Sequence, residues 1–445
     1  MRTPGQRGVV IALGATQTLA WASSTYLPAI LAAPIARDLD VSRATVFGAF
    51  SISLLVMAAA GPLVGRAIDR AGGRHMLMWS NLVLAAGLVM LGMAHHVLML
   101  FAAWCILGAG MAMGLYDAAF AALVRLYGSD ARKPITGITL IAGFASTVGW
   151  PLSAYMDAEI GWRAACFVWA ALHLVIALPV NWKLIPAVAA GPAYGAVAAD
   201  HTAPVAPGTA GSDNAAPDAA VPGKATRGAA APGAAASDRT ADSAARNIAT
   251  ASPAAPDRAA RRRRFALLGV YFASTAFVTS AYASHLPGLL TVMGAGAAGA
   301  VFAAALLGPA QVAARLVEFG IISRYKLHAL ITARAATALH PLACVLLAAF
   351  GGPPMLAAVF ALLHGAGNGM ITIAKGTLPL ALFGPAGYGL TQGWLGVGAR
   401  VMQAAAPYAF GLVLDGWGGN AALAISAGLS LLALGALFAL QPRAG

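Results

Sequence analysis

The sequence predicts an all-α membrane protein whose twelve transmembrane helices form two six-helix bundles related by pseudo-symmetry. Three observations support this fold class. Hydrophobic residues make up 60% of the 445-residue chain and charged residues only 10%, whereas soluble domains carry about 25% charged residues. Twelve segments reach the length of about 20 mostly apolar residues that a membrane-spanning helix needs. A polar stretch over residues 187–262 divides these segments into two groups of six.

The first six predicted spans belong to a domain of residues 1–186, and the other six belong to a domain of residues 263–445. The first span follows Arg2 and Arg7, as a signal peptide would, but its apolar run is too long for one. We therefore expect it to remain as the first helix. The predicted spans cover residues 8–33, 44–66, 74–94, 97–127, 134–157 and 162–185, then 265–291, 296–321, 327–350, 354–383, 387–413 and 419–441.

The stretch 187–262 consists almost entirely of Ala, Pro, Gly, Ser, Thr and Asp, and Tyr194 is its one aromatic residue. Such a composition cannot bury enough apolar surface to offset the entropy lost on ordering, which predicts a disordered linker. The linker ends in the basic run Arg261–Arg264. A basic run beside a membrane span is typical of a cytoplasmic anchor.

The net charge of +13 would suggest nucleic-acid binding in a soluble protein, but the positions of the charges argue against nucleic acid as a partner. With the N-terminus inside, 21 of the 28 Lys and Arg residues lie on the side of the linker and three on the opposite side. Cytoplasmic loops carry such an excess of basic residues. We therefore expect a multi-pass protein of the cell (inner) membrane, with both termini and the linker in the cytoplasm.

The two groups of spans also resemble each other in sequence. Thr25–Leu31 in the first span matches Ser284–Leu290 in the seventh, and Gly108–Gly110 in the fourth matches Gly365–Gly367 in the tenth. A parallel repeat of two six-helix halves is the architecture in which a transporter alternates its access around a site near the middle of the membrane.

The connector after the second span, Gly65–Arg74, resembles the signature loop of the major facilitator superfamily, G-x-x-x-D-R-x-G-R-R. Gly73 stands where the pattern usually has Arg. The resemblance extends over the whole chain, because twelve spans and a central linker are also typical of that superfamily. The residues that fit the motif are Gly65, Asp69, Arg70, Gly72 and Arg74.

The resemblance implies that this connector is a gating loop. Asp69 places a carboxylate at the cytoplasmic mouth, where it can meet a helix N-terminus or basic residues of the opposite half. Such a contact would exist in one conformation and break in the other. The alternative is a solvated connector whose arginines only set the topology.

Charged residues inside the spans are the main functional candidates, because a charge within a membrane is costly. Arg400 lies near the middle of the eleventh span with no acid on its own face, so it must meet a distant acid, a carbonyl or a substrate. Arg315 has Glu318 three residues on, and an ion pair between them is the alternative to a substrate contact. The six charged residues are Asp117, Arg315, Glu318, Arg334, Lys375 and Arg400.

Cations outnumber acids inside the second group of spans, which favours an anionic substrate. Monocarboxylate transporters and oxalate/formate antiporters use cations on the eighth and eleventh spans, and this chain resembles that branch in carrying Arg315 and Arg400 there. The resemblance implies a carboxylate site at these two residues. Polar residues of other spans complete the predicted substrate-binding set: Lys375, Asn368, Gln403, Tyr26, Tyr282 and His285.

Asp117 on the fourth span is the predicted proton-coupling residue, because a buried carboxylate can take up and release a proton. The alternative is an ionised Asp117 that is held by a cation across the interface between the halves. Lys375, at the nearly equivalent place in the tenth span, is the candidate for that cation.

The sequence therefore predicts a monomeric secondary transporter in the lipid bilayer that moves a small organic anion by alternating access, either coupled to protons or by exchange. Proton-driven efflux of drugs or hydrophobic compounds is one alternative, and a non-transporting membrane sensor or lipid-handling protein is another. We expect no enzyme activity, cofactor or metal site, because the sequence has no Cys–His metal spacing and no phosphate-binding loop.

Overall fold

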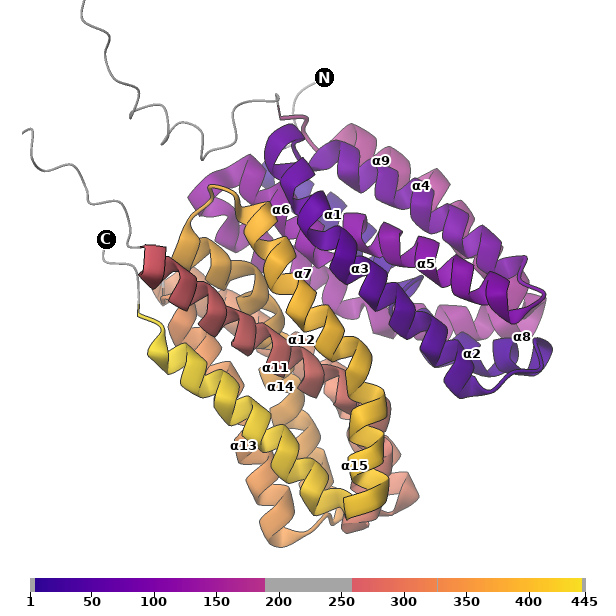
Figure 1. The fold of residues 1–445 in the computed structure, drawn as a ribbon, viewed down its shortest axis with the longest axis vertical. Coiled ribbons are helices and arrows are strands. Elements are labelled where there is room, and N and C mark those ends of the chain that lie inside the picture. The colour runs from indigo at the N-terminus through magenta and orange to yellow at the C-terminus, as the bar shows by residue number, and fades with distance from the viewer. Residues whose placement is uncertain (1–4, 189–257, 326, 442–445) are drawn as a thin grey trace, which may run out of the picture. The chain divides into compact units, whose positions relative to one another are not determined.

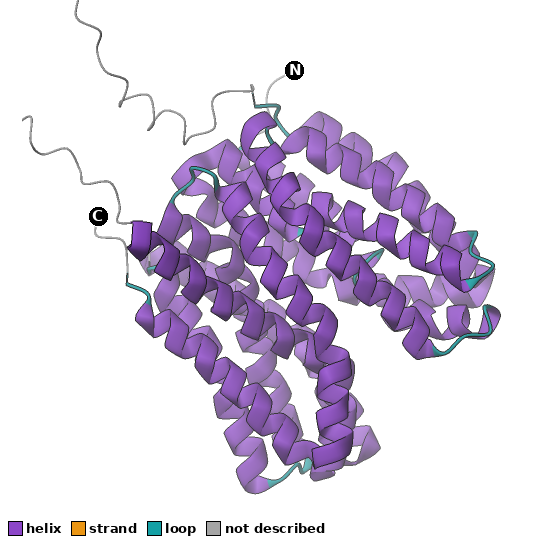
Figure 2. Ribbon diagram, in the orientation of Figure 1, coloured by secondary structure: helices purple, strands orange, loops and turns teal. Residues whose placement is uncertain are grey.

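A computed structural model describes residues 5–188, 258–325 and 327–441. Every secondary-structure element within these ranges is a helix (Figure 2). The described residues of both helical halves belong to one compact unit. Figure 1 colours the first half from indigo to magenta and the second half through orange to yellow. The prediction of a disordered linker over 187–262 falls almost wholly outside the described residues.

The first half contains nine α-helices among the residues that the structure describes. A π-helical turn, His173–Ala177, connects the last two of them. Gly161 reverses the chain inside the eighth helix, because its φ of 79° is a backbone conformation that glycine adopts without steric cost. The nine helices are α1 (Gln6–Ala22), α2 (Leu27–Asp38), α3 (Arg43–Ala71), α4 (Gly73–Gly92), α5 (Val97–Gly114), α6 (Tyr116–Tyr127), α7 (Arg132–Ile141), α8 (Ala145–Leu172) and α9 (Leu178–Leu184).

The first and fourth predicted spans are interrupted by residues outside any helix. The first span is interrupted between Ala22 and Leu27, where Pro28 occupies the first turn of α2. The fourth span is interrupted at Leu115, whose extended backbone ends α5 and begins α6. Breaks of this kind near the middle of a span are typical of transporter binding sites.

The second half consists of five long helices in its described part. Gly294 between the first two has a φ of 108°, and Gly418 with a φ of 81° reverses the chain inside the last helix. The first helix begins at Arg258, so the run Arg261–Arg264 lies in its opening turns, where Arg is a good helix former. The helices are α11 (Arg258–Leu290), α12 (Gly296–Tyr325), α13 (Ala329–Phe350), α14 (Pro354–Phe383) and α15 (Tyr388–Ala439).

These helices confirm the predicted fold class. The described residues form eight continuous helical stretches that are long and apolar enough to cross a membrane. The stretches Val97–Leu184, Arg258–Gly320 and Tyr388–Ala439 contain more than one predicted span each, because the chain turns back within them. The twelve predicted spans are therefore accounted for.

The Gly-Ala-Gly repeat packs in the same way in both halves. A Cβ at Gly108 would overlap the backbone of Ser53 on α3, and one at Gly365 would lie 2.8 Å from the carbonyl oxygen of Leu307 on α12. Gly110 and Gly367 contact α4 and α13 in the corresponding way. Small residues allow helix backbones to approach closely in membranes, and the matching contacts support the predicted pseudo-symmetry.

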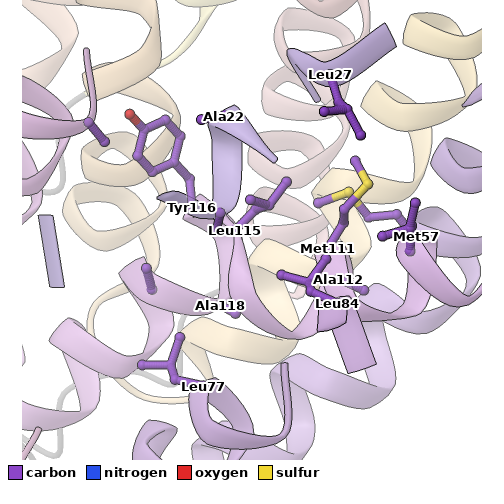
Figure 3. Close-up of a cluster of buried hydrophobic side chains, with 14 of the residues drawn as sticks. Ala22, Leu27, Met57, Leu77, Leu84, Met111, Ala112, Leu115, Tyr116 and Ala118 are labelled. Atoms are coloured by element: carbon purple, nitrogen blue, oxygen red, sulfur yellow. The ribbon is translucent and has the colours of Figure 1, made fainter. Parts of the chain in front are cut away.

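Apolar side chains fill the interior of each half. Figure 3 shows part of the first-half core, where Leu84, Met111 and Leu115 lie in a buried cluster. Tyr116, directly after the break in the fourth span, belongs to the same cluster. The halves contact each other through α3, α6 and α7 on one side and α12, α14 and α15 on the other.

Candidate functional site

An ion pair joins the two halves at the beginning of α6. Nη2 of Arg400 on α15 donates a hydrogen bond of 2.9 Å to Oδ2 of Asp117. The Arg400 side chain is 15% exposed and that of Asp117 25%, and both line a small pocket together with residues of α3 and α15. Because the chain breaks at Leu115, Asp117 occupies the first turn of α6, where the helix dipole favours a carboxylate.

Neighbouring side chains of α15 orient this pair. Gln392 donates through Nε2 to Oδ1 of Asp117 at 3.0 Å, and Nη1 of Arg400 donates to Oε1 of Gln403 at 2.7 Å. Gly396 lies between them, and a Cβ at that position would be 3.5 Å from Oδ2 of Asp117. Gln392, Arg400 and Gln403, which lie on one face of α15, therefore form the group that holds Asp117.

Lys375 on α14 is the second cation near Asp117. It is partly buried and interacts electrostatically with both Asp117 and Arg400. Within the described ranges, Lys375 makes no hydrogen bond and no ion pair within 4.0 Å. Asp117 is thus paired with Arg400, whereas the sequence suggested Lys375, and this one carboxylate faces two cations.

Arg315 reaches across the interface between the halves. Its side chain on α12 is 5% exposed. It donates through Nε to the carbonyl oxygen of Gly369 at 3.3 Å and through Nη1 to that of Thr139 on α7 at 3.2 Å. Glu318 forms no ion pair with Arg315 in the part of the chain that the structure describes. The local pair suggested by their spacing is therefore absent.

Asp69 caps the N-terminus of α15 from the opposite half. Its Oδ1 accepts a hydrogen bond from the backbone N–H of Gly389, and its Oδ2 accepts one from that of Leu390, both at 2.8 Å. The first N–H groups of a helix have no partner within the helix, and the helix dipole attracts a negative charge to that end. Of the partners that the sequence suggested for Asp69, the structure shows the helix N-terminus.

Glycines bring α3 and α15 into backbone contact beside this cap. A Cβ at Gly65 would overlap the carbonyl oxygen of Gly389, and a Cβ at Gly393 would lie 2.5 Å from that of Gly61. We call these four residues the glycine seam. Gly65 of the signature loop is therefore required by the close approach of a helix from the other half.

The remaining residues of the signature loop shape the turn between α3 and α4. Gly72 has a φ of 81°, which only glycine adopts freely. A Cβ at Gly73 would overlap that of Ala122 on α6, so the small residue suits a place where the motif usually has Arg. Arg70 is exposed, and Nε of Arg74 is buried without a hydrogen-bond partner among the described residues.

Three predicted substrate-binding residues have their contacts within the second half. Tyr282 is only 1% exposed, and its hydroxyl lies 2.7 Å from Oγ of Ser426. His285 contacts the carbonyl oxygen of Pro407 through Nε2 at 2.7 Å, and Oδ1 of Asn368 accepts a hydrogen bond from Thr279. The structure thus places Tyr282 in the core of the half, so we leave it out of the site proposed below.

Sequence reasoning missed two features of the interface. Arg132, which seemed only a topological charge, donates through Nη1 to the carbonyl oxygen of Leu327 in the other half. The break in the first span brings Tyr26 next to Trp21, with ring centroids 5.9 Å apart, and Trp21 next to Tyr116, 4.8 Å apart. Pro28 was the available signal for the break, but nothing in the sequence indicated the cluster.

The sequence profile of the Major Facilitator Superfamily matches residues 13–374. This chain belongs to the major facilitator superfamily. It is therefore a multi-pass membrane protein with the fold of secondary transporters that work by alternating access. The predicted superfamily is confirmed, while the carboxylate-transporting branch stays a prediction.

Two solved structures of superfamily members resemble the chain over nearly its whole length. The human organic anion transporter MFSD10 (TETRAN) has a TM-score of 0.64 at 17% identity, covering 98% of this chain and 100% of its own. FucP, crystallised in the outward conformation, has a TM-score of 0.65 at 14% identity, covering 97% and 98%. At these identities the likeness shows the shared fold. Among curated proteins, none matches the sequence.

Proposed function

We propose that this protein carries a small organic anion across the cell membrane by alternating access, and that the anion binds between Arg400, Lys375 and Arg315. The observation that carries the proposal is the charge imbalance at the interface between the halves. Asp117 is the one carboxylate paired with Arg400, and Lys375 interacts with the same two groups without a bonded partner in the described residues.

The imbalance matters because the groups are shielded from water. A buried charge without a partner is destabilising, and this cost is reduced when an opposite charge binds beside it. Arg315 donates two hydrogen bonds to carbonyl oxygens and has no carboxylate within 4.0 Å in the described chain. A carboxylate or a similar anion would restore neutrality, and the planar guanidinium of Arg400 suits two parallel hydrogen bonds.

Asp117 supports the coupling part of the proposal. An anion that binds Arg400 must compete with the Asp117 carboxylate for the same guanidinium. Once displaced, Asp117 loses its strongest partner, and a proton would neutralise the charge that is left in a shielded site. Anion binding and proton uptake then favour each other, which suits proton-coupled transport. Exchange of one anion for another needs only the first step.

Asp69 supports the gating part of the proposal. The cap on α15, the glycine seam and the Arg132–Leu327 contact all lie toward the helix ends from which residues 189–257 depart. The distribution of Lys and Arg assigns this side to the cytoplasm. In the proposed cycle these contacts close the cytoplasmic side, and they must break before substrate can exchange with that compartment.

Counterflow of labelled carboxylates in proteoliposomes tests the proposed function. We expect at least one acid of a broad panel to exchange, and we expect other acids to inhibit it competitively. Asp117→Asn removes the competing charge, so this variant should bind the transported anion more tightly in a thermal-shift titration. It should also lose transport that is driven by a pH gradient.

Two results would contradict the proposal. If the wild-type protein exchanges no acid of the panel, an organic anion is not its substrate. An Asp117→Asn variant that melts at a much lower temperature, with no gain in anion affinity, would show that Asp117 only ties the halves together.

A further inference from the structure

Five aromatic side chains from three parts of the first half form one cluster beside the interface. The rings of Trp21 and Tyr116 are 4.8 Å apart, and Tyr116 stacks on Phe120 with 5.2 Å between centroids. Tyr26, at the break between α1 and α2, meets the edge of Trp150 on α8 at 5.9 Å. We call these five residues the aromatic wall. None of them is used by the ion pair or by the cytoplasmic contacts.

The aromatic wall contains polar groups that have no hydrogen-bond partner among the described residues. Nε1 of Trp21 is buried without a hydrogen bond in the described residues, although an indole N–H is a donor that is usually bonded when buried. The hydroxyls of Tyr26 and Tyr116 also make no hydrogen bond within the described chain. Tyr116 is 8% exposed and belongs to the buried cluster of the first half (Figure 3).

Arg315 of the second half faces the aromatic wall. Its Nη1 donates to the carbonyl oxygen of Thr139 on α7, which places the guanidinium at the surface of the first half, and it interacts electrostatically with both Tyr26 and Tyr116. Tyr116 is followed by Asp117, which binds Arg400 on α15. The first turn of α6 thus directs one side chain toward each of two cations, and the wall lies directly beside the proposed anion site.

We propose that the aromatic wall binds the ring of the substrate, and that the transported anion is an aromatic carboxylate. This inference rests on the proposed function and adds the substrate class to it. Aromatic rings prefer offset or edge-to-face contacts with other rings, and the wall offers both a ring face and ring edges. The carboxylate of such a molecule would meet the cations of the second half, while its ring would lie against the first half.

Trp150→Leu is the substitution that tests this inference. The Trp150 side chain is 43% exposed, so its loss should not disturb the core. The probes are labelled benzoate and labelled acetate, which differ by the ring alone, in counterflow with the full-length protein. Wild type should have a KM for benzoate at least tenfold below that for acetate. Trp150→Leu should raise the KM for benzoate about three- to tenfold, the range expected for the loss of one aromatic contact.

Two further variants make this result specific. Trp150→Phe keeps a ring and should restore most of the benzoate affinity. Trp79→Leu removes an indole that is 60% exposed on α4 and lies outside the wall, so both KM values should stay within about twofold of wild type. The KM for acetate should change little in Trp150→Leu, because acetate has no ring to contact the wall.

The outcomes separate this inference from the proposed function. Wild type that exchanges acetate as well as benzoate, or a Trp150→Leu variant with unchanged KM for benzoate, would overturn the aromatic substrate and leave the anion site standing. Wild type that exchanges neither benzoate, acetate nor any other carboxylate would overturn both.

Discussion

At the scale of single residues, Asp69 is the clearest test of gating, because its two carboxylate oxygens bind two backbone N–H groups of the other half. Asp69→Asn keeps the size of the side chain but loses the charge and one acceptor. We expect the contact to weaken by about 1.5–3 kcal/mol, the range for hydrogen bonds to a charged group. Counterflow should slow about tenfold or more, while the melting temperature changes little.

Asp130 provides the matched control for Asp69. It is exposed on the same side of the protein, in the turn between α6 and α7, so Asp130→Asn should leave transport unchanged. A well-folded Asp69→Asn protein with the exchange rate of wild type would remove the gating role.

Arg400 is the single residue whose substitution tests the proposed anion site most directly. Arg400→Lys keeps the charge but loses the planar pair of donors, so binding should weaken while some transport survives. Arg400→Gln loses both, and the loss of a charge-assisted hydrogen bond, about 1.5–3 kcal/mol, corresponds to about ten- to a hundredfold in affinity. Thermal shift with and without carboxylates measures binding and stability in one sample.

The same measurement separates a binding role of Arg400 from a structural one. Its hydrogen bonds to Asp117 and Gln403 predict some loss of stability in any variant. An Arg400→Gln protein that keeps full stabilisation by carboxylates would contradict the anion site.

At the scale of helices, the glycine seam predicts that α3 and α15 must approach closely in this conformation. Gly65→Ala adds a Cβ that would overlap the backbone of Gly389, so the helices must move apart. Added volume in a packed contact costs about 1–3 kcal/mol, and here it should destabilise the state that is closed on the linker side. We expect counterflow to fall severalfold or more.

Gly48→Ala is the control for the seam, because it lies on the same helix and a Cβ there would meet nothing within 4 Å. Transport by this variant should match that of wild type. A Gly65→Ala protein that transports equally well would show that the seam is not a constraint on the cycle.

The helix boundaries show which parts of the fold could be predicted from the sequence. The twelve spans follow from hydropathy, since backbone groups in a membrane must be satisfied within helices. The break at Leu115 was not predicted, because a Gly-rich run gives no unique place for it. Asp117 and Arg400 are 283 positions apart, so only the tertiary crossing of α6 and α15 could identify the pair.

Other contacts near the candidate site also depend on residues that are distant in the sequence. Helical spacing places Arg315 and Glu318 on one face, yet Arg315 reaches instead to a carbonyl of the other half. Tyr282 is a polar residue on an otherwise apolar span, and the sequence therefore suggested that it lines a cavity. Its hydroxyl is satisfied by Ser426 inside the same half, and a sequence pattern does not reveal such a distant partner.

At the scale of the whole molecule, the two halves are joined by few polar contacts with different roles. Asp69 and Arg132 bind backbone groups of the opposite half outside the proposed anion site, whereas Arg315, one of the proposed anion-binding cations, also donates to a carbonyl oxygen of the opposite half. The Asp117–Arg400 pair is the contact that an anion can replace directly. Substrate can therefore bias the equilibrium between conformations, since a ligand shifts it only through differential affinity for the two states.

A covalent cross-link between the halves tests whether they must separate on the linker side. A Cβ at Gly376 on α14 would lie 2.8 Å from Cγ2 of Ile135 on α7, and a disulfide needs Cβ atoms about 3.8 Å apart. We expect Ile135→Cys with Gly376→Cys to form a disulfide on oxidation, in a protein whose three native cysteines are replaced by Ala. The oxidised protein should lose counterflow, and reduction should restore it, because alternating access requires these helix ends to part. A protease site inserted within residues 190–253 measures the cross-linked fraction, since the cleaved halves then stay together only through the disulfide. Each single-cysteine variant should transport under both conditions, and full transport by completely cross-linked protein would contradict opening at this side.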